Sequence, residues 1–158
     1  MNKTIERVNG IKLFSENDKV ISASIDGKFE IETFFMWRQE IFNNKDDGFF
    51  IVVGAYTGIY SIAVASSGYI CFAFEPNKEV VKRLDENIIL NANRNIRGSV
   101  VIFPYAVMDE DKTYYFHCNN ITKMTSGGSI SENKIKSRYA VDCVTLDKVF
   151  ENTHKKVI

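Results

Sequence analysis

Hydrophobic residues along the chain alternate between strand-like runs and helical spacing. Ile11–Phe14 and Val20–Ile25 alternate apolar and polar positions, which predicts two short strands near the N-terminus. From Glu30 to Phe42 the apolar residues recur at helical spacing and predict an amphipathic helix packed on the next strand. Phe49–Val53 is a continuous β-prone run between two glycines, which is typical of a central strand buried on both faces of a parallel sheet.

Helix and strand patterns keep alternating after that run. Ile59–Ser67 and Asn77–Asn91 show helical periodicity, and Tyr69–Phe74 and Val100–Phe103 are β-prone. Strands that alternate with helices in this way predict a doubly wound α/β fold, in which ligands bind beyond the carboxyl ends of the strands. Farther along the chain we expect two more strands and a helix, at Thr113–His117, Arg138–Val144 and Thr145–Asn152.

The length and composition fit one globular domain. The 158 residues, of which 45% are apolar, are enough for one core and too few for two domains of ordinary size. We expect N-terminal strands and the amphipathic helix in residues 1–48, and a Rossmann-like doubly wound core in residues 49–158. The last residues, Lys155-Lys156-Val157-Ile158, look like a strand that has just begun, so we expect the sheet to be incomplete at the C-terminus. Because an open sheet edge exposes apolar surface, we also expect self-association or pairing with a missing C-terminal segment.

Charge and cysteine content narrow the expected partners. Lys and Arg number 20 and balance 20 Asp and Glu, so no net field favours nucleic acid or an anionic membrane. Apolar runs such as Phe49–Val53 are far below the roughly 20 residues of a spanning helix, and the polar N-terminus lacks the apolar region of a signal peptide. Cys71, Cys118 and Cys143 show neither metal-site spacing nor the density of a disulfide scaffold. We therefore expect a cytoplasmic protein with reduced thiols, no membrane partner and no metal.

Gly54-Ala55-Tyr56-Thr57-Gly58 joins the first core strand to the following helix. A backbone that bends sharply there leaves amide groups facing a ligand, and the missing side chains of Gly54 and Gly58 let a ligand approach. Two glycines at this spacing also arise from close helix packing, which is the competing interpretation. The segment lacks the G-x-G-x-x-G spacing of dinucleotide sites and the G-K-S/T ending of a P-loop, so it does not indicate a pyrophosphate group.

Glu75 ends the second core strand, about 20 residues after the first glycine. A carboxylate at that place accepts hydrogen bonds from both ribose hydroxyls of a bound nucleoside. The alternative is a surface glutamate ahead of a helix, stabilised by the helix dipole. Pro76, at the first helical turn, fits either interpretation. The glycine turn and Glu75 together predict a nucleoside-binding half-site.

Several segments resemble, in order and spacing, the successive motifs of the FkbM-type methyltransferases: Gly54–Ser61, Ala73–Asn77, Leu84–Asn91 and Pro104–Asp109. Asp18–Ser22 with Phe29-Glu30, and Val144–Asp147, are also similar to that family, so the resemblance covers nearly the whole chain. It implies an S-adenosylmethionine-dependent methyltransferase with the Rossmann-like fold of the class I enzymes. It further implies methylation of a hydroxyl group on a sugar, glycan or polyketide-like compound, so the expected partner is a small-molecule or glycan acceptor.

The resemblance also assigns cofactor-binding residues. It implies that the glycine turn contacts the donor through Gly54, Ala55, Tyr56, Thr57 and Gly58, with Gly54, Ala55 and Gly58 at the methionine end. Glu75 then holds the ribose, and Pro76 and Asn77 flank the adenosine. Beyond the third core strand, Ala106 and Val107 are expected to lie near the adenine.

Two features depart from the family pattern. Val52 stands where the family usually has an acidic residue, two positions before the first glycine, and valine makes no polar contacts with the donor's amino-acid moiety. After Val144–Asp147 the family continues to a Lys-x-Asp-x-Glu-Gly type motif beside the methyl group, whereas this sequence ends at Ile158. We therefore expect the donor-binding half of a methyltransferase. The alternatives are a truncated or degenerate non-catalytic nucleoside-binding domain and, against the glycine spacing, half of a nicotinamide oxidoreductase.

The remaining polar residues name no catalytic group. His117 and His154 are interpreted as ordinary strand or surface histidines, because no partner carboxylate is identifiable from the sequence. Asp109-Glu110-Asp111 is expected to form a solvated turn. Ser126-Gly127-Gly128-Ser129 is expected to be a loop, which by analogy with the family lies near the acceptor.

Overall fold

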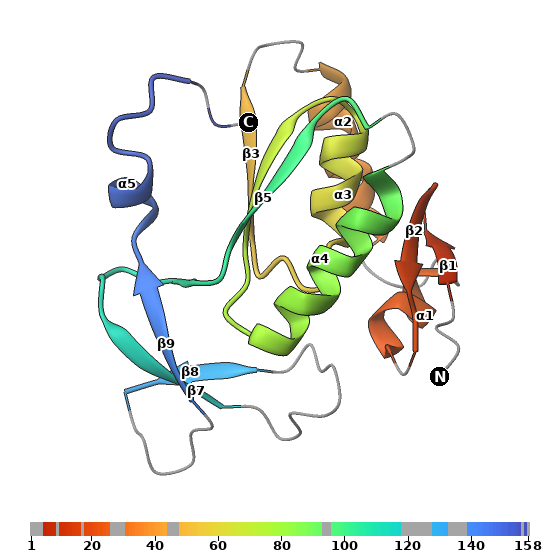
Figure 1. Ribbon diagram of the computed structural model, residues 1–158. Coiled ribbons are helices and arrows are strands. Elements are labelled where there is room, and N and C mark those ends of the chain that lie inside the picture. The colour runs from red at the N-terminus through yellow and green to blue at the C-terminus, as the bar shows by residue number, and fades with distance from the viewer. Residues whose placement is uncertain are drawn as a thin grey trace.

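The computed structural model describes residues 5–8, 10–16, 18–25, 31–43, 48–92, 96–117, 128–132, 139–155 and 157. It has a mixed α/β fold built around a parallel sheet. Figure 1 shows helices beside this sheet, an N-terminal hairpin beyond those helices, and a second sheet next to its lower end. None of the helices in the described ranges is both long enough and apolar enough to cross a membrane.

The elements follow one another in the order β1 (Ile5–Val8), β2 (Ile11–Phe14), α1 (Lys19–Ile25), α2 (Ile31–Asn43), β3 (Phe49–Val53), α3 (Ile59–Ser66), β4 (Ile70–Phe74), α4 (Lys78–Ala92), β5 (Ser99–Phe103), β6 (Ala106–Val107), β7 (Thr113–His117), β8 (Ser129–Ser131), β9 (Tyr139–Val144) and α5 (Leu146–Val149). β1 and β2 form an antiparallel hairpin, and β3-β4-β5 form the parallel sheet. The second sheet has the order β6-β9-β7-β8, in which β6 is parallel to β9 and the other pairs are antiparallel.

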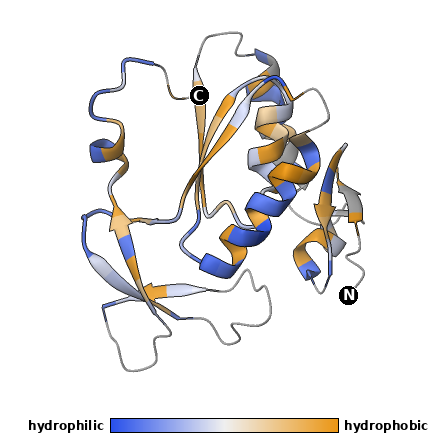
Figure 2. Cartoon of the chain, viewed as in Figure 1, coloured by the Kyte–Doolittle hydropathy of each residue, from blue (hydrophilic) through white to orange (hydrophobic). Residues whose placement is uncertain are grey.

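Alternate residues of the parallel sheet face different layers, as the two-residue period of a strand requires. Phe50 and Cys71 pack against Val64 of α3, whereas the ring of Phe72 contacts Phe150, which follows α5. Figure 2 shows hydrophobic residues along β3 and α3, while much of α4 is hydrophilic. The sheet core therefore lies between α3 and the segment around Phe150.

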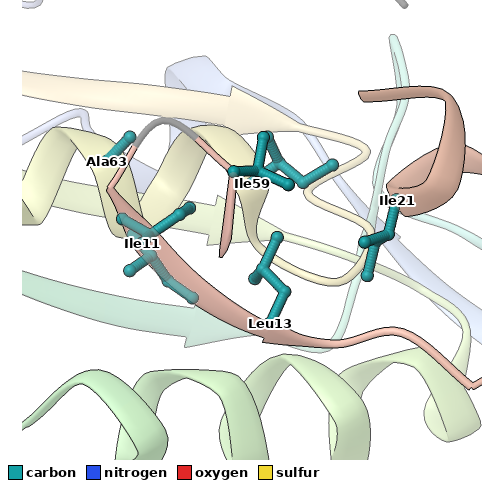
Figure 3. Close-up of a cluster of buried hydrophobic side chains, with 7 residues drawn as sticks. Ile11, Leu13, Ile21, Ile59 and Ala63 are labelled. Carbon is teal, nitrogen blue, oxygen red and sulfur yellow. The ribbon is translucent and has the colours of Figure 1, made fainter. Parts of the chain in front are cut away.

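The N-terminal hairpin packs on the two helices that follow the core strands. Ile11 and Leu13 of β2, Ile21 of α1, and Ile59 and Ala63 of α3 gather in one buried cluster (Figure 3). Leu13 and Ile21 are both 0% exposed. This cluster fixes the hairpin and α1 next to the segment that connects β3 to α3.

The predicted strand at Val20–Ile25 is wrong, because these residues form helix α1. The carboxylate Oδ1 of Asp18 accepts hydrogen bonds from the amides of Val20 at 2.9 Å and Ile21 at 3.1 Å, which is the arrangement of a helix N-cap. The hydroxyls of Ser22 and Ser24 donate to the carbonyls four residues earlier. The apolar alternation indicated a strand, but the cap at Asp18 and tertiary packing of Ile21 decide for a helix.

The other core elements are confirmed, with one change of place. β4, and not β3, is the middle strand of the parallel sheet, and Val53 at the end of β3 is 55% exposed. On the other side of β3, the described residues contribute one parallel bridge, between Phe49 and Val157. Where a strand was expected to begin, Val157 thus pairs with β3 through this single bridge.

Short elements were predicted less well. The strands β1, β6 and β8 were not predicted, and the helix expected over Thr145–Asn152 shortens to α5. The helix predicted from Glu30 is confirmed as α2, which packs through Trp37 and Ile41 on the cluster around Phe50. Of the loop expected at Ser126-Gly127-Gly128-Ser129, the first two residues lie outside the described residues, as does Cys118.

Candidate functional site

The glycine turn between β3 and α3 has an unusual backbone. Gly54 has φ 72°, Tyr56 has φ 50° and Gly58 has φ 96°, all in the left-handed region. The amides of Gly54 and Ala55 both donate to the carbonyl of Phe74, each at 2.9 Å. The turn is therefore folded over the carboxyl end of β4, and Tyr56 is held in a conformation that is rare for a residue with a side chain.

The two glycines of the turn serve different purposes. A Cβ at Gly54 would meet no atom within 4 Å, so the main chain is open to a ligand there. A Cβ at Gly58 would lie 2.5 Å from Cδ1 of Leu84, a fully buried residue of α4. Close helix packing, the competing interpretation of this glycine pair, thus applies to Gly58, whereas Gly54 lines a cavity.

Glu75 follows β4 and is fixed by the main chain on both sides. Its Oε2 accepts the amide of Tyr56 at 3.0 Å, and its Oε1 accepts the amide of Asn77 at 2.9 Å. The residue is 7% exposed, and burial raises its pKa above the ordinary 4.5, although the amides of Asn77 and Tyr56 oppose that rise. The carboxylate is therefore held rigidly and without a cation in the ion pairs of the described residues.

Asn77 caps the N-terminus of α4 beside this carboxylate. Its Oδ1 accepts the amide of Glu79 at 3.1 Å. Tyr139 of β9 reaches the same place, because its hydroxyl accepts the amide of Lys78 at 3.2 Å and donates to Oδ1 of Asn77 at 3.4 Å. The second sheet is thereby tied to the start of α4, next to Glu75.

A cavity of about 520 Å³ lies at the carboxyl ends of β3 and β4 and is bordered by both sheets. Six of the predicted cofactor-binding residues line it, namely Gly54, Ala55, Tyr56, Glu75, Pro76 and Asn77. Four others lie outside its lining. Thr57 and Gly58 are buried residues of the turn itself, Ala106 is buried in the core of the second sheet, and Val107 is half-buried.

Gly128 and Ser129, from the loop expected near the acceptor, also line the cavity. Further lining residues were not predicted from the sequence: Val20, Ile59, Tyr60, Met108, Phe116 and Ile130. Phe116 is the most constrained of them, because its ring stacks on Tyr139 with 5.4 Å between centroids and an interplanar angle of 21°. A Cβ at Gly128 would lie 2.3 Å from Cζ of Phe116. Only the alternation of Tyr114 and Phe116 along β7 could have indicated which strand face carries this ring.

Tyr56 connects the cavity to the N-terminal part of the chain. Burial, followed by the nearby Asp18 carboxylate, raises the pKa of Tyr56 well above its usual range, so the phenol stays protonated. Asp18 is 1% exposed, and burial raises the pKa of its carboxyl, although hydrogen bonds from Ile21, Tyr56 and Val20 oppose that rise. Val20, which follows the Asp18 cap, lines the cavity itself.

The remaining candidates lie away from this cavity. His117 has Nε2 2.8 Å from Oγ of Ser131, and His154 is exposed. Val52 is half-buried and packs with the apolar clusters of the sheet. Asp109-Glu110-Asp111 is exposed as expected, and the described residues include no cluster of His, Cys, Asp or Glu suited to a metal ion.

Comparison with known proteins identifies the family. No curated protein matches the chain. A family model described as the Methyltransferase FkbM domain matches residues 53–158, a span that contains the glycine turn, Glu75 and Phe116. The match covers more than half of the chain and agrees with the motif resemblance. The chain therefore belongs to the FkbM methyltransferase domain family.

Proposed function

We propose that this chain is the donor-binding part of an S-adenosylmethionine-dependent methyltransferase with a Rossmann-like class I fold. The observation that carries the proposal is the Glu75 carboxylate. It lies at the carboxyl end of β4, borders the cavity, and has each oxygen oriented by one main-chain amide. A carboxylate oxygen has two lone-pair directions, so each oxygen of Glu75 retains capacity for one ribose hydroxyl.

The residues of the cavity fit such a donor. The volume of about 520 Å³ lies within the roughly 300–1,000 Å³ range of small-molecule sites. Gly54 leaves the main chain open at the turn, and Met108, Phe116 and Ile130 supply an apolar wall suited to a base. A lining that combines the Glu75 carboxylate with apolar side chains suits the polar ribose and the flat base of a nucleoside.

When bound, S-adenosylmethionine supplies a methyl group already activated on a sulfonium centre. The chain's own residues then have to bind the donor, orient it towards the acceptor and exclude water. These tasks account for much of the catalysis in such a displacement. Glu75 orients the ribose, and the glycine turn meets the amino-acid end. For the acceptor, the family resemblance favours a hydroxyl group of a sugar, glycan or polyketide-like compound.

Isothermal titration calorimetry with S-adenosylhomocysteine tests the proposal on the wild type and Glu75→Gln. Because charge-assisted hydrogen bonds to ribose are lost, we expect the variant to bind about 100-fold more weakly. Glu79→Gln is the matched control, since Glu79 is on the exposed first turn of α4 and pairs with Lys82 at 2.8 Å. No saturable binding by the wild type, or equal binding by Glu75→Gln, would overturn the proposal; preferential binding of NADH would favour an oxidoreductase half-domain.

Acidification gives the same two proteins a second readout. Ribose binding needs the charged carboxylate, so the wild-type affinity falls as the pH descends through the raised pKa of Glu75 towards 4.5. In the ligand-free chain the sign is reversed, because a raised pKa gives stability that is present below 4.5 and lost as the pH rises through the folded-state value. The difference in melting temperature between wild type and Glu75→Gln, followed as a function of pH, separates the contribution of the Glu75 carboxyl from those of the other titrating side chains.

A non-catalytic nucleoside-binding domain is the second candidate, and Val52 favours it. This residue packs into the apolar clusters of the sheet, where the family usually has an acidic side chain. Incubation with methyl-labelled S-adenosylmethionine and a panel of sugar-containing acceptors separates the two candidates. Label transfer to any acceptor excludes the non-catalytic one, whereas donor binding without transfer across the panel favours it.

A further inference from the structure

Asn87, on α4, connects two parts of the chain that are far apart in sequence. It is 0% exposed. Its Oδ1 accepts the amide of Phe14 in β2 at 2.9 Å, and its Nδ2 donates to the carbonyl of Thr57 in the glycine turn at 2.8 Å. A single buried side-chain amide thus holds the N-terminal hairpin and the turn at once.

Asn91 lies one helical turn farther along α4 and contacts the same hairpin. Its Oδ1 accepts the amide of Lys12 at 2.9 Å, and its Nδ2 donates to the carbonyl of Lys12 at 2.7 Å and to that of Asn87 at 2.7 Å. Together the two asparagines pair with β2 as a neighbouring strand would. Asn91 is 1% exposed, and its described hydrogen bonds do not include the turn.

The turn needs such support from α4. Tyr56 has φ 50°, a conformation that costs energy and persists only where the surroundings determine it. Thr57 is 0% exposed, so its carbonyl depends on a protein partner, and Asn87 provides one. On the same helix, Leu84 packs under Gly58.

The hydrogen bond between Asn87 and the turn also bears on the Glu75 carboxylate, which borders the cavity. The amide of Tyr56 donates to Oε2 of Glu75, and the carbonyl that Asn87 holds belongs to the next residue along the chain. Rotation of the Thr57 carbonyl away from Asn87 therefore changes the backbone that directs the Tyr56 amide. We propose that Asn87 is a positioning residue of the donor site, which makes donor affinity depend on docking of the hairpin at residues 5–14.

This inference extends beyond the part of the chain that the family model matches. The hairpin precedes residue 53, where the match begins. The donor-affinity arm of its test rests on the proposed function, whereas the backbone arm does not. The two arms make failure of this inference distinguishable from failure of the proposed function.

The experiment compares Asn87→Ala with Asn91→Ala in the full chain. Both substitutions remove buried hydrogen bonds to the hairpin, so both lower the melting temperature. We expect Asn87→Ala to bind S-adenosylhomocysteine about tenfold more weakly than the wild type, and Asn91→Ala to bind it less than about twofold more weakly. The reason is that Asn87→Ala loses a hydrogen bond to the turn, whereas the described bonds lost in Asn91→Ala do not reach the turn. Amide hydrogen exchange over residues 54–58 should accelerate in Asn87→Ala and stay near the wild-type rate in Asn91→Ala.

Asn87→Asp keeps the test decisive if Asn87→Ala does not fold. Ionised aspartate retains an oxygen acceptor for the Phe14 amide and has no donor for the Thr57 carbonyl, so at a pH where it is charged it removes the contact with the turn and keeps the one with the hairpin. Equal exchange over residues 54–58 in the Asn87 and Asn91 variants would overturn the inference. A wild type that binds no S-adenosylhomocysteine would overturn the proposed function instead, and the exchange rates would still decide the role of Asn87.

Discussion

The glycine turn and the second sheet line the same cavity by different means. The turn contributes main chain, with Gly54 open to the cavity and Gly58 packed on α4, and its amide orients Glu75. The second sheet contributes side chains, above all the rings and aliphatic groups of Phe116 and Ile130. One side of the cavity is thus determined by backbone conformation and the other by side-chain packing.

This difference has consequences for how each side responds to substitution. A left-handed backbone position has few acceptable residues, so changes in the turn disturb both the fold and the site. A side-chain wall is not restricted in backbone conformation, so changes in the second sheet act through packing and alter the shape of the cavity together with stability. Substitutions in the turn, in the second sheet and at the link between them test this comparison, beginning with the largest expected effect.

Gly58→Ala is expected to have the largest effect on stability. The new Cβ adopts φ 96° and lies 2.5 Å from Cδ1 of buried Leu84, so it combines backbone strain with overpacking. We expect a loss of about 2–5 kcal/mol in the free energy of unfolding, measured by urea denaturation.

Gly54→Ala is the control for that substitution, because its φ of 72° is also left-handed but its Cβ would meet no protein atom within 4 Å. We expect it to cost about 1 kcal/mol of stability and to weaken S-adenosylhomocysteine binding more than that loss explains, since the added methyl enters the cavity. Equal losses of stability in the two variants would contradict the assignment of Gly58 to helix packing and of Gly54 to the cavity lining.

Gly128→Ala tests the side-chain wall. The added Cβ would lie 2.3 Å from Cζ of Phe116, and the ring cannot retreat freely because Tyr139 stacks on it. We expect a loss of about 1–3 kcal/mol from overpacking, together with altered donor affinity. Gly68→Ala is a contrasting comparison, because that glycine has φ 104° and its Cβ would be in ordinary contact with Arg97 at 3.7 Å, so the variant reports backbone strain without overpacking. If Gly128→Ala binds S-adenosylhomocysteine like the wild type, Phe116 does not shape the donor site.

The same difference explains what the sequence could predict. Gly54 and Glu75, which line the cavity, could be predicted as candidates because turn chemistry and a carboxylate at a strand end are local signals with a fixed spacing. Phe116 and Ile130 were not, since their approach to the cavity depends on the pairing of β7 with β8 and β9. Ala106 was expected near the adenine but is buried in the second sheet, and Met108 lines the cavity in its stead.

The N-terminal part shows a second limit of local patterns. Val20–Ile25 alternates like a strand, yet the cap at Asp18 starts a helix there, and the buried face of that helix is defined by contact with β2 and α3. Asn87 and Asn91 belong to a segment that resembles the family, but their contacts with β2 could not be predicted. Polar residues in a helix give no indication of the strand that they pair with. Tertiary partners, and not local preferences, decide these positions.

Tyr139→Phe is the smallest change and tests the link between the two sides of the cavity. It preserves the ring that stacks on Phe116 and removes the hydroxyl that accepts the Lys78 amide and donates to Asn77. Because one hydrogen bond is long and the other is at an exposed helix end, we expect a loss of about 1 kcal/mol or less in the free energy of unfolding. Binding of S-adenosylhomocysteine should weaken by a similar free energy if the link holds the second sheet in place over Glu75. Unchanged affinity would mean that this hydroxyl does not hold the second sheet against the start of α4, and the two sides of the cavity would then be independent.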